Sequence, residues 1–175
     1  MKKSKFITGN FYLLAFFILC LCKIKIASAD DFRKASKLSN CSISADIITL
    51  NDVANWNNCW GTYEYKEKSG EKMLFDGEFK SGRLNGKGRI YFYGKGEILP
   101  SGLMYIGEFK DGNYHGIGTY IHKGDESTFG KRVGQFKNGR FDGLGIEYSG
   151  DGTILGEGVW ESDILIKELK TEYSK

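Results

Sequence analysis

The sequence predicts an all-β protein, a stack of antiparallel β-hairpins that forms an elongated, twisted, single-layer sheet. Two observations lead to this fold class. Of the 24 glycines in the 175-residue chain, 23 lie between Gly61 and Gly158. Within that region three segments align without gaps, and aromatic residues and glycines recur in them at every second position, a period typical of β-strands.

The aligned segments are three copies of one unit, at residues 75–88, 105–118 and 132–145. Each copy carries glycine at offsets 0, 5, 9 and 11. These repeat glycines are Gly77, Gly82, Gly86, Gly88, Gly107, Gly112, Gly116, Gly118, Gly134, Gly139, Gly143 and Gly145. Half-copies flank them at 58–63 and 156–160. The first glycines of successive units lie 30, 27 and 24 residues apart, so the unit is constant and only the connection shortens.

Each unit is predicted to be a β-hairpin. In the second unit, Tyr105 and Phe109 share one face of the first strand with the glycine between them. The pair Asp111-Gly112 follows, and Ser81-Gly82 and Asn138-Gly139 stand at the equivalent places. Asp-Gly and Asn-Gly pairs accept the positive φ angles that tight hairpin turns require. The chain therefore reverses at each of these pairs.

Glycine inside a strand normally weakens it, so its recurrence on the aromatic face indicates a steric purpose. A missing side chain leaves a hole into which a ring from a facing strand or from the next unit can lie flat. The predicted stripe of rings is Tyr63, Phe75, Phe79, Tyr105, Phe109, Tyr120, Phe136 and Trp160. We interpret these rings as the core rather than as a sugar-binding surface, because the sheet has no other hydrophobic layer.

These residues resemble the MORN (membrane occupation and recognition nexus) repeats, whose pattern is Tyr-x-Gly-x-x-x-x-Gly-x-x-x-Gly-x-Gly-x-Tyr. The resemblance covers about residues 58–160, and 105–120 match every defined position. The departures are Arg132 and Gly156 at the leading aromatic, Ile90 and Glu147 at the closing aromatic, and Cys59 at a glycine. Members of the family are associated with protein scaffolding and with membrane attachment, so the resemblance implies an interaction module.

Residues 1–29 have the pattern of a signal peptide. A lysine-rich start precedes the apolar stretch 11–22, and Ala27-Ser28-Ala29 forms a small-x-small cleavage site before Asp30. Twelve apolar residues are too few to span a bilayer core of about 30 Å. We therefore expect cleavage after Ala29 and export to the periplasm or the extracellular space. The alternative is an uncleaved membrane anchor, because 17 mostly apolar residues run from Phe6 to Cys22.

Removal of the signal peptide leaves two cysteines, Cys41 and Cys59, which lie 18 positions apart. In an oxidising compartment they can form a disulfide, and the alternative is two separate, half-buried thiols. Cysteine-containing openings similar to this one occur in exported bacterial proteins that the chain resembles, which favours the disulfide.

The two ends of the repeat region are expected to differ. Residues 30–56 contain no glycine, and they are predicted to form an N-terminal capping segment that packs over the first hairpin. The repeat domain is predicted at 57–169, and residues 170–175 are predicted to be a frayed tail.

Charge and composition exclude several classes of function. Without residues 1–29 the chain carries 20 basic and 22 acidic residues, so a basic surface for nucleic acid is not expected. The two histidines, His115 and His122, are too few for a multi-histidine metal site. The Gly-x-Gly pairs do not complete a dinucleotide-binding motif, and no nucleophile stands beside a base. We therefore predict a protein that is not an enzyme, with no cofactor and no metal.

The predicted function is an exported scaffold or interaction module that binds a protein or a cell-envelope component. The alternative is binding of envelope lipid or polysaccharide, through exposed rings or through a row of lysines at one offset, Lys80, Lys110 and Lys137. Glu78, Glu108 and Gln135 recur two residues before these lysines and are expected to share their solvated face. Exposed acid–base pairs along that face would contribute about 0–1 kcal/mol each.

Overall fold

A computed structural model describes residues 33–34, 36–42, 50–94, 102–123 and 129–169. Nine antiparallel strands form one sheet in the order β1 to β9, so each strand pairs with its neighbours in the chain. The elements are α3 (Leu50–Ala54), β1 (Cys59–Lys66), β2 (Lys72–Lys80), β3 (Arg83–Tyr93), β4 (Leu103–Lys110), β5 (Asn113–Lys123), β6 (Phe129–Lys137), β7 (Arg140–Tyr148), β8 (Ile154–Glu161) and β9 (Ile164–Glu168). The predicted fold class is confirmed.

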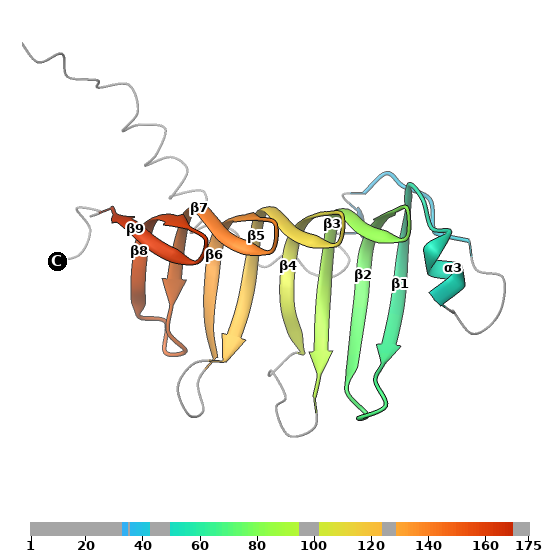
Figure 1. Ribbon diagram of the computed structural model, residues 1–175, viewed down its shortest axis with the longest axis horizontal. Helices are drawn as coiled ribbons and strands as arrows, with labels where there is room; N and C mark the ends of the chain where they lie inside the picture. The colour runs from blue at the N-terminus through green and yellow to red at the C-terminus, as the bar shows by residue number, and fades with distance from the viewer. Residues whose placement is uncertain (1–32, 35, 43–49, 95–101, 124–128, 170–175) are drawn as a thin grey trace, which may run out of the picture.

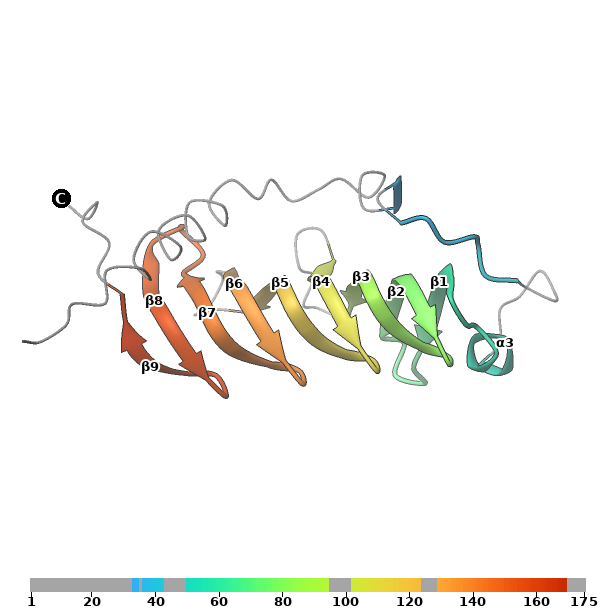
Figure 2. The same cartoon turned by 90° about the horizontal axis from the view of Figure 1, so that it is seen from above.

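The strands lie side by side in one elongated layer, with α3 next to β1 at one end and β9 at the other (Figure 1). Seen from above, the hairpins curve in the same direction along the whole sheet (Figure 2). Within the described residues, no helix is long and apolar enough to cross a membrane. The predicted signal peptide at 1–29 and the predicted tail at 170–175 lie outside those residues.

The tight turns lie where the sequence places them. At Asp111-Gly112 the φ angles are 51° and 84°, and Ser81-Gly82 and Asn138-Gly139 have the same positive pair of signs. Two successive positive φ angles match the right-handed twist of a hairpin, and they favour glycine at the second position. A fourth turn, Ser162-Asp163, joins β8 to β9 without any glycine.

A continuous row of glycines crosses the sheet. The register pairs each of them with the next, strand by strand: Gly61, Gly77, Gly88, Gly107, Gly118, Gly134, Gly145 and Gly158. Large side chains lie over this row. A Cβ atom added to Gly118 would lie 2.2 Å from the Tyr105 hydroxyl oxygen, and one added to Gly145 would lie 2.1 Å from the Phe141 ring. The row is therefore a groove that rings fill.

A β-bulge in each repeat brings the side chains over the groove. In the first hairpin the register passes from Gly77–Gly88 to Phe79–Leu84, so the returning strand carries two extra residues. The same shift occurs between β4 and β5 and between β6 and β7. Bulges bend a strand and increase its twist. The bend lets Leu84 fold back over the glycine pair of its own hairpin, within 3.1 Å of a Cβ on Gly77.

Each turn is also bonded to the preceding unit. The amide of the second turn residue donates to a backbone carbonyl of that unit, at 2.9 Å in all four cases. The donor–acceptor pairs are Gly82 to Trp56, Gly112 to Leu84, Gly139 to Tyr114 and Asp163 to Phe141. Trp56, Leu84 and Phe141 also pack over the glycine row, so each of them both fills the groove and holds the next turn. In the second unit the acceptor, Tyr114, stacks on Tyr105, which fills the groove there.

We expect Gly118→Ala to destabilise the fold by about 1–3 kcal/mol, because the new methyl group overpacks the space that the Tyr105 ring fills. Gly152→Ala is the control, since a Cβ there meets no atom within 4 Å. Its positive φ should cost about 1–2 kcal/mol at most. Thermal unfolding followed by circular dichroism measures both. Equal melting temperatures for Gly118→Ala and the wild type would contradict the packing of this groove.

Candidate functional site

The turns of the three repeat units form hairpin tips along one edge of the sheet. The first tip is Ser81-Gly82, the second is Asp111-Gly112 and the third is Asn138-Gly139. Lys80, Lys110 and Lys137 are exposed and each ends its strand directly before a turn, so the structure places the three predicted lysines in equivalent positions. Across the turns, Lys80 pairs with Arg83 and Lys137 pairs with Arg140. The sequence prediction did not include these two arginines. They double the positive charge at the first and third tips.

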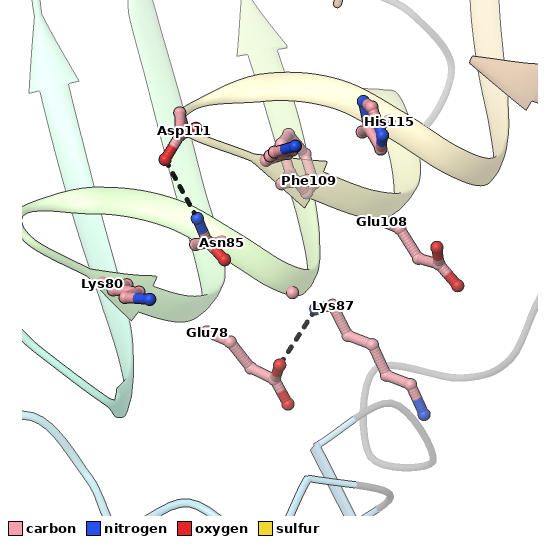
Figure 3. Close-up of a pocket in the computed structure, with 10 residues that line it drawn as sticks. Glu78, Lys80, Asn85, Lys87, Glu108, Phe109, Asp111 and His115 are labelled. Atoms are coloured by element: carbon pink, nitrogen blue, oxygen red, sulfur yellow. Dashed lines mark hydrogen bonds between the residues drawn. The ribbon is translucent and has the colours of Figure 1, made fainter. Parts of the chain in front are cut away.

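A surface hollow of about 620 Å³ lies between the first and second tips. It brings together Lys80 and Lys110, but not Lys137. Its lining is Glu78, Lys80, Asn85, Gly86, Lys87, Glu108, Phe109, Lys110, Asp111 and His115 (Figure 3). Three lysines therefore face three carboxylates and one histidine. Asn85 donates to the Asp111 carboxylate at 3.2 Å, which ties one wall of the hollow to the other.

Glu78 and Gln135, which share one offset of the repeat, hold the bulges of the first and third units. A carboxylate oxygen of Glu78 accepts a hydrogen bond from the Lys87 amide at 3.1 Å. In the third unit the Gln135 side-chain oxygen accepts from the Leu144 amide at 2.7 Å. These bonds satisfy amides that the bulge removes from the strand ladder. Ion pairs between this row and the neighbouring lysines, which the sequence suggested, do not occur among the described residues.

A glycine stands at the same offset in each unit, directly before the bulge residue whose amide is discussed above, and its backbone conformation explains why it recurs. Gly86, Gly116 and Gly143 have φ angles of 108°, 61° and 113°. A Cβ at Gly86 would also lie 2.0 Å from a carboxylate oxygen of Glu78. The positive φ therefore favours glycine at this offset, and the Glu78 carboxylate would have to move to make room for any larger residue.

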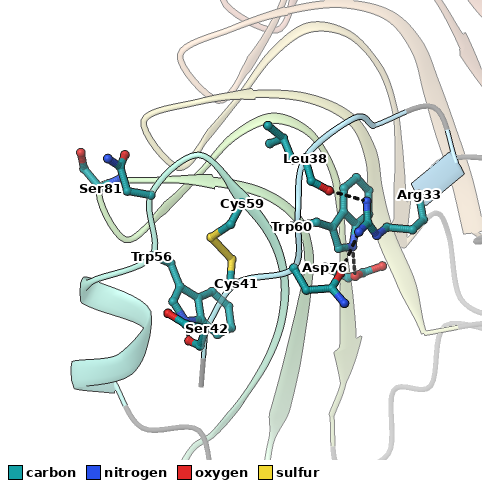
Figure 4. The surroundings of a disulfide bond; sticks show 11 residues. Arg33, Leu38, Cys41, Ser42, Trp56, Cys59, Trp60, Asp76 and Ser81 are labelled. Carbon is teal, nitrogen blue, oxygen red and sulfur yellow. Dashed lines mark hydrogen bonds between the residues drawn. A yellow bond between two sulfur atoms is a disulfide. The ribbon is translucent and has the colours of Figure 1, made fainter. Parts of the chain in front are cut away.

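The edge of β1 carries a short cap that includes the two cysteines. Cys41 and Cys59 form a disulfide with Cα atoms 4.9 Å apart (Figure 4). Beside it, the Trp60 amide donates to the Ser39 carbonyl and the Cys41 amide donates to the Trp60 carbonyl, both at 2.8 Å. Trp56 fills the groove above Gly61, where a Cβ would lie 2.3 Å from its ring. This segment thus takes the place of a preceding hairpin.

The family comparison agrees with this geometry. The model of the MORN repeat matches three segments of the chain, residues 75–96, 105–124 and 133–154. The chain contains three MORN repeats. MORN repeats indicate an interaction or scaffold module built from repeated units. No curated protein matches the chain.

Two departures from the MORN pattern compensate each other. Arg132 and Glu147 replace aromatic residues, and the register places them directly opposite. The Arg132 Nε donates to a Glu147 carboxylate oxygen at 3.0 Å, while the guanidinium carbon lies 5.6 Å from the ring centres of both Phe141 and Trp160. The planar guanidinium therefore lies against these rings where the leading aromatic of a regular MORN repeat would stand.

The predicted stripe is part of the core. Phe79, Phe109, Phe136 and Trp160 are 3–5% exposed, and Tyr105 is fully buried. The remaining members, Tyr63, Phe75 and Tyr120, pack against this cluster and are partly buried. The sequence prediction missed Leu84, Tyr114 and Phe141. They share one offset, seven residues after the first glycine, and that offset is apolar in all three MORN repeats.

Tyr105 is the centre of the aromatic cluster. Its ring stacks on Tyr114 at 3.9 Å between centres and meets Phe109 and Phe136 edge-on at 5.0 and 5.3 Å. Its hydroxyl donates to the Glu108 carbonyl at 3.1 Å. Burial raises the pKa of both Tyr105 and Tyr114 far above the usual value for tyrosine, because the phenolate would lose its hydration.

The two histidines lie in different surroundings. His115 lines the hollow between the first two tips. His122 Nε2 lies 3.5 Å from the Glu147 carboxylate, next to Arg132. Among the described residues, no three His, Cys, Asp or Glu side chains are grouped so that they could hold a metal ion.

The raised tyrosine pKa values predict a loss of stability at alkaline pH. Tyrosine in the unfolded chain ionises near its ordinary pKa of about 10, whereas Tyr105 and Tyr114 stay neutral in the fold. Their contribution is therefore complete below about pH 10 and is lost above it, by about 1.4 kcal/mol per pH unit for each tyrosine. Denaturant unfolding of the wild type and of Tyr105→Phe/Tyr114→Phe at a series of pH values measures this slope.

The double variant should show a smaller fall in unfolding free energy above about pH 10 than the wild type. Tyr65→Phe is the matched control, because Tyr65 is 38% exposed and should leave the slope unchanged. Parallel pH profiles for the wild type and the double variant would contradict the prediction.

Proposed function

We propose that the chain is an exported, non-enzymatic MORN-repeat module that binds a protein or a cell-envelope component through the hairpin tips. The observation that carries the proposal is the hollow between the first two tips. Its three lysines and three carboxylates present both signs of charge within one surface. A protein surface offers both signs in return, whereas a polyanion is repelled by half of the charges.

The roles of the recurring polar residues support a binding rather than a catalytic function. Glu78 and Gln135 hold the bulges, and Asp76 is buried. Asp76 accepts hydrogen bonds from Trp60 and Arg89 at 3.0 and 2.6 Å. These groups stabilise the repeat, and a group so engaged is not positioned to transfer a proton to a bound molecule.

Export is supported by the sequence of residues 1–29 and by the geometry of Cys41 and Cys59. A disulfide persists in an oxidising compartment and is rare in a reducing one. The bond closes the cap onto β1 at the end of the sheet where the N-terminal segment enters.

Intact-mass measurement of the protein from the exporting cell tests this part of the proposal. We expect the mass of the chain without residues 1–29, and no alkylation of Cys41 or Cys59 before reduction. Alkylation of both after reduction is the control. A mass that retains the signal peptide would favour the membrane anchor, and alkylation without reduction would contradict the disulfide.

Binding of anionic lipid is the second candidate, and the tip edge supports it. Lys80, Arg83, Lys137 and Arg140 are all exposed at the tips of the first and third hairpins. Sugar binding through the predicted rings has less support, because Phe109 and Trp160 are buried. Only Tyr65 and Tyr93 are exposed rings in the described part of the chain, and both lie away from the tips.

Site-specific photo-crosslinking in the exporting cell tests the leading function. A photo-reactive residue in place of Lys87, inside the hollow, should give one discrete protein adduct. The same residue in place of Lys66, which is exposed at the far end of β1, is the matched control and should give none. Adduct formation should fall at least tenfold in Lys110→Glu, because the charge pattern of the hollow is changed. Equal adducts at both positions would contradict a specific partner.

Co-sedimentation with phosphatidylglycerol vesicles separates the lipid function from the leading one. We expect the wild type to stay in the supernatant, like Lys80→Glu/Lys110→Glu/Lys137→Glu. Binding by the wild type that salt weakens and the triple variant lacks would instead establish the lipid function.

A further inference from the structure

The two ends of the sheet are finished differently. At β1 the edge is covered by the bridge between Asn40 and Trp60 and by the disulfide. At the other end β9 is the last strand, and within the described residues no strand pairs with its outer edge. An uncovered edge presents a row of backbone donors and acceptors that can pair with another strand.

Exposed apolar side chains gather at this open end. Ile164 and Ile166 of β9 are 67% and 56% exposed, and Ile154 and Leu155 of β8 are 51% and 62% exposed. In the described part of the chain, the other large exposed hydrophobic residues are the tyrosines Tyr65 and Tyr93. β9 follows directly on the Ser162-Asp163 turn, and the charged residues of the strand itself, Lys167 and Glu168, lie at its C-terminal end. Soluble proteins usually protect an edge of this composition.

We propose that β9 pairs with β9 of a second copy of this chain, which joins two sheets into one continuous sheet about a two-fold axis. The sequence of the strand is self-complementary in one antiparallel register. With Leu165 opposite Leu165 of the second copy, Ile164 lies opposite Ile166, and Asp163 lies opposite Lys167. A two-fold axis makes each of these contacts twice.

The contacts on either side of the axis suit this register. Leu165 already packs against the hydrophobic core, so a second Leu165 extends the buried stripe across the interface. Asp163 accepts bonds from Arg132 and from the Phe141 amide through one carboxylate oxygen, Oδ1, in both cases. The other oxygen, Oδ2, accepts neither of these bonds and can face Lys167.

The cap at β1 favours this symmetric pairing over head-to-tail stacking. In a head-to-tail stack, β9 of one copy would pair with β1 of the next copy. A carbonyl of the first copy would then have to accept the hydrogen bond from the first turn of the next copy. That place is occupied within the chain, because the Trp56 carbonyl already accepts from Gly82 and the Trp56 ring already fills the groove above Gly61. The assembly is therefore a closed dimer rather than a filament.

Sedimentation of the full chain, expressed with its own N-terminal segment, tests the dimer. We expect the wild type to have about twice the monomer mass at micromolar concentration and Ile164→Lys/Ile166→Lys to be monomeric, because four lysines would meet in the interface. Ile154→Lys/Leu155→Lys is the matched control. It adds the same charge at similarly exposed positions outside β9, and it should remain dimeric.

Disulfide trapping tests the register independently of stability. Ile164→Cys and Ile166→Cys should crosslink when the two proteins are mixed, at least tenfold more than either protein alone, because only the mixed pair places the two cysteines directly opposite. A monomeric wild type would overturn the proposal. Crosslinking of Ile166→Cys with itself in preference to the mixture would overturn the register centred on Leu165.

Discussion

The structure depends on the close contact between glycine backbones and the side chains that lie on them. The glycine row runs through eight strands without interruption, and an added methyl group would overlap a ring, as at Gly118, or the neighbouring backbone, as at Gly77. A single-layer sheet has no second layer to bury its apolar face, so it must provide its own cover. The bulges do this, since they fold the tip of each hairpin back over the groove, and they leave one amide per unit for Glu78 or Gln135 to satisfy.

The contact requires a side chain that covers the glycine row, but it does not require one particular type of residue. Leu84, Phe141 and Trp56 all fill the groove, and in the second unit the Tyr105 ring enters it with Tyr114 stacked above. In the third unit a guanidinium stacks on Phe141 instead of a phenol ring, and it is neutralised by Glu147. Because each carbonyl at this position also accepts the next turn, a unit is complete only when its successor is present, as expected for a repeat protein.

The sequence was sufficient to predict the hairpins because short, local sequence patterns specify them. Paired residues such as Asp111-Gly112 specify a turn, and the period of two assigns Tyr105 and Phe109 to the correct face. The rings over the groove could not be assigned in this way, since Phe141 lies beside a bulge that interrupts the alternation. For the same reason Glu78 was expected to pair with lysines, whereas it bonds to an amide that only the bulge exposes. The arginines at the tips were missed because their shared offset is basic only in the first and third units, and Asn113 occupies it in the second.

The candidate binding surface depends on the difference between positions that repeat in every unit and positions that vary. Positions that serve the groove or the turns recur in every unit, so they cannot distinguish one part of the sheet from another. The hollow between the first two tips is specific because it also includes Asp111 and His115, whose counterparts in the third unit are Asn138 and Asp142. The turn bonds fix the tips relative to one another, so the proposed binding at the tips would cost little conformational entropy. Under the proposed function, a rigid repeat with a few variable tip residues would select its partner through the charges that differ between successive turns.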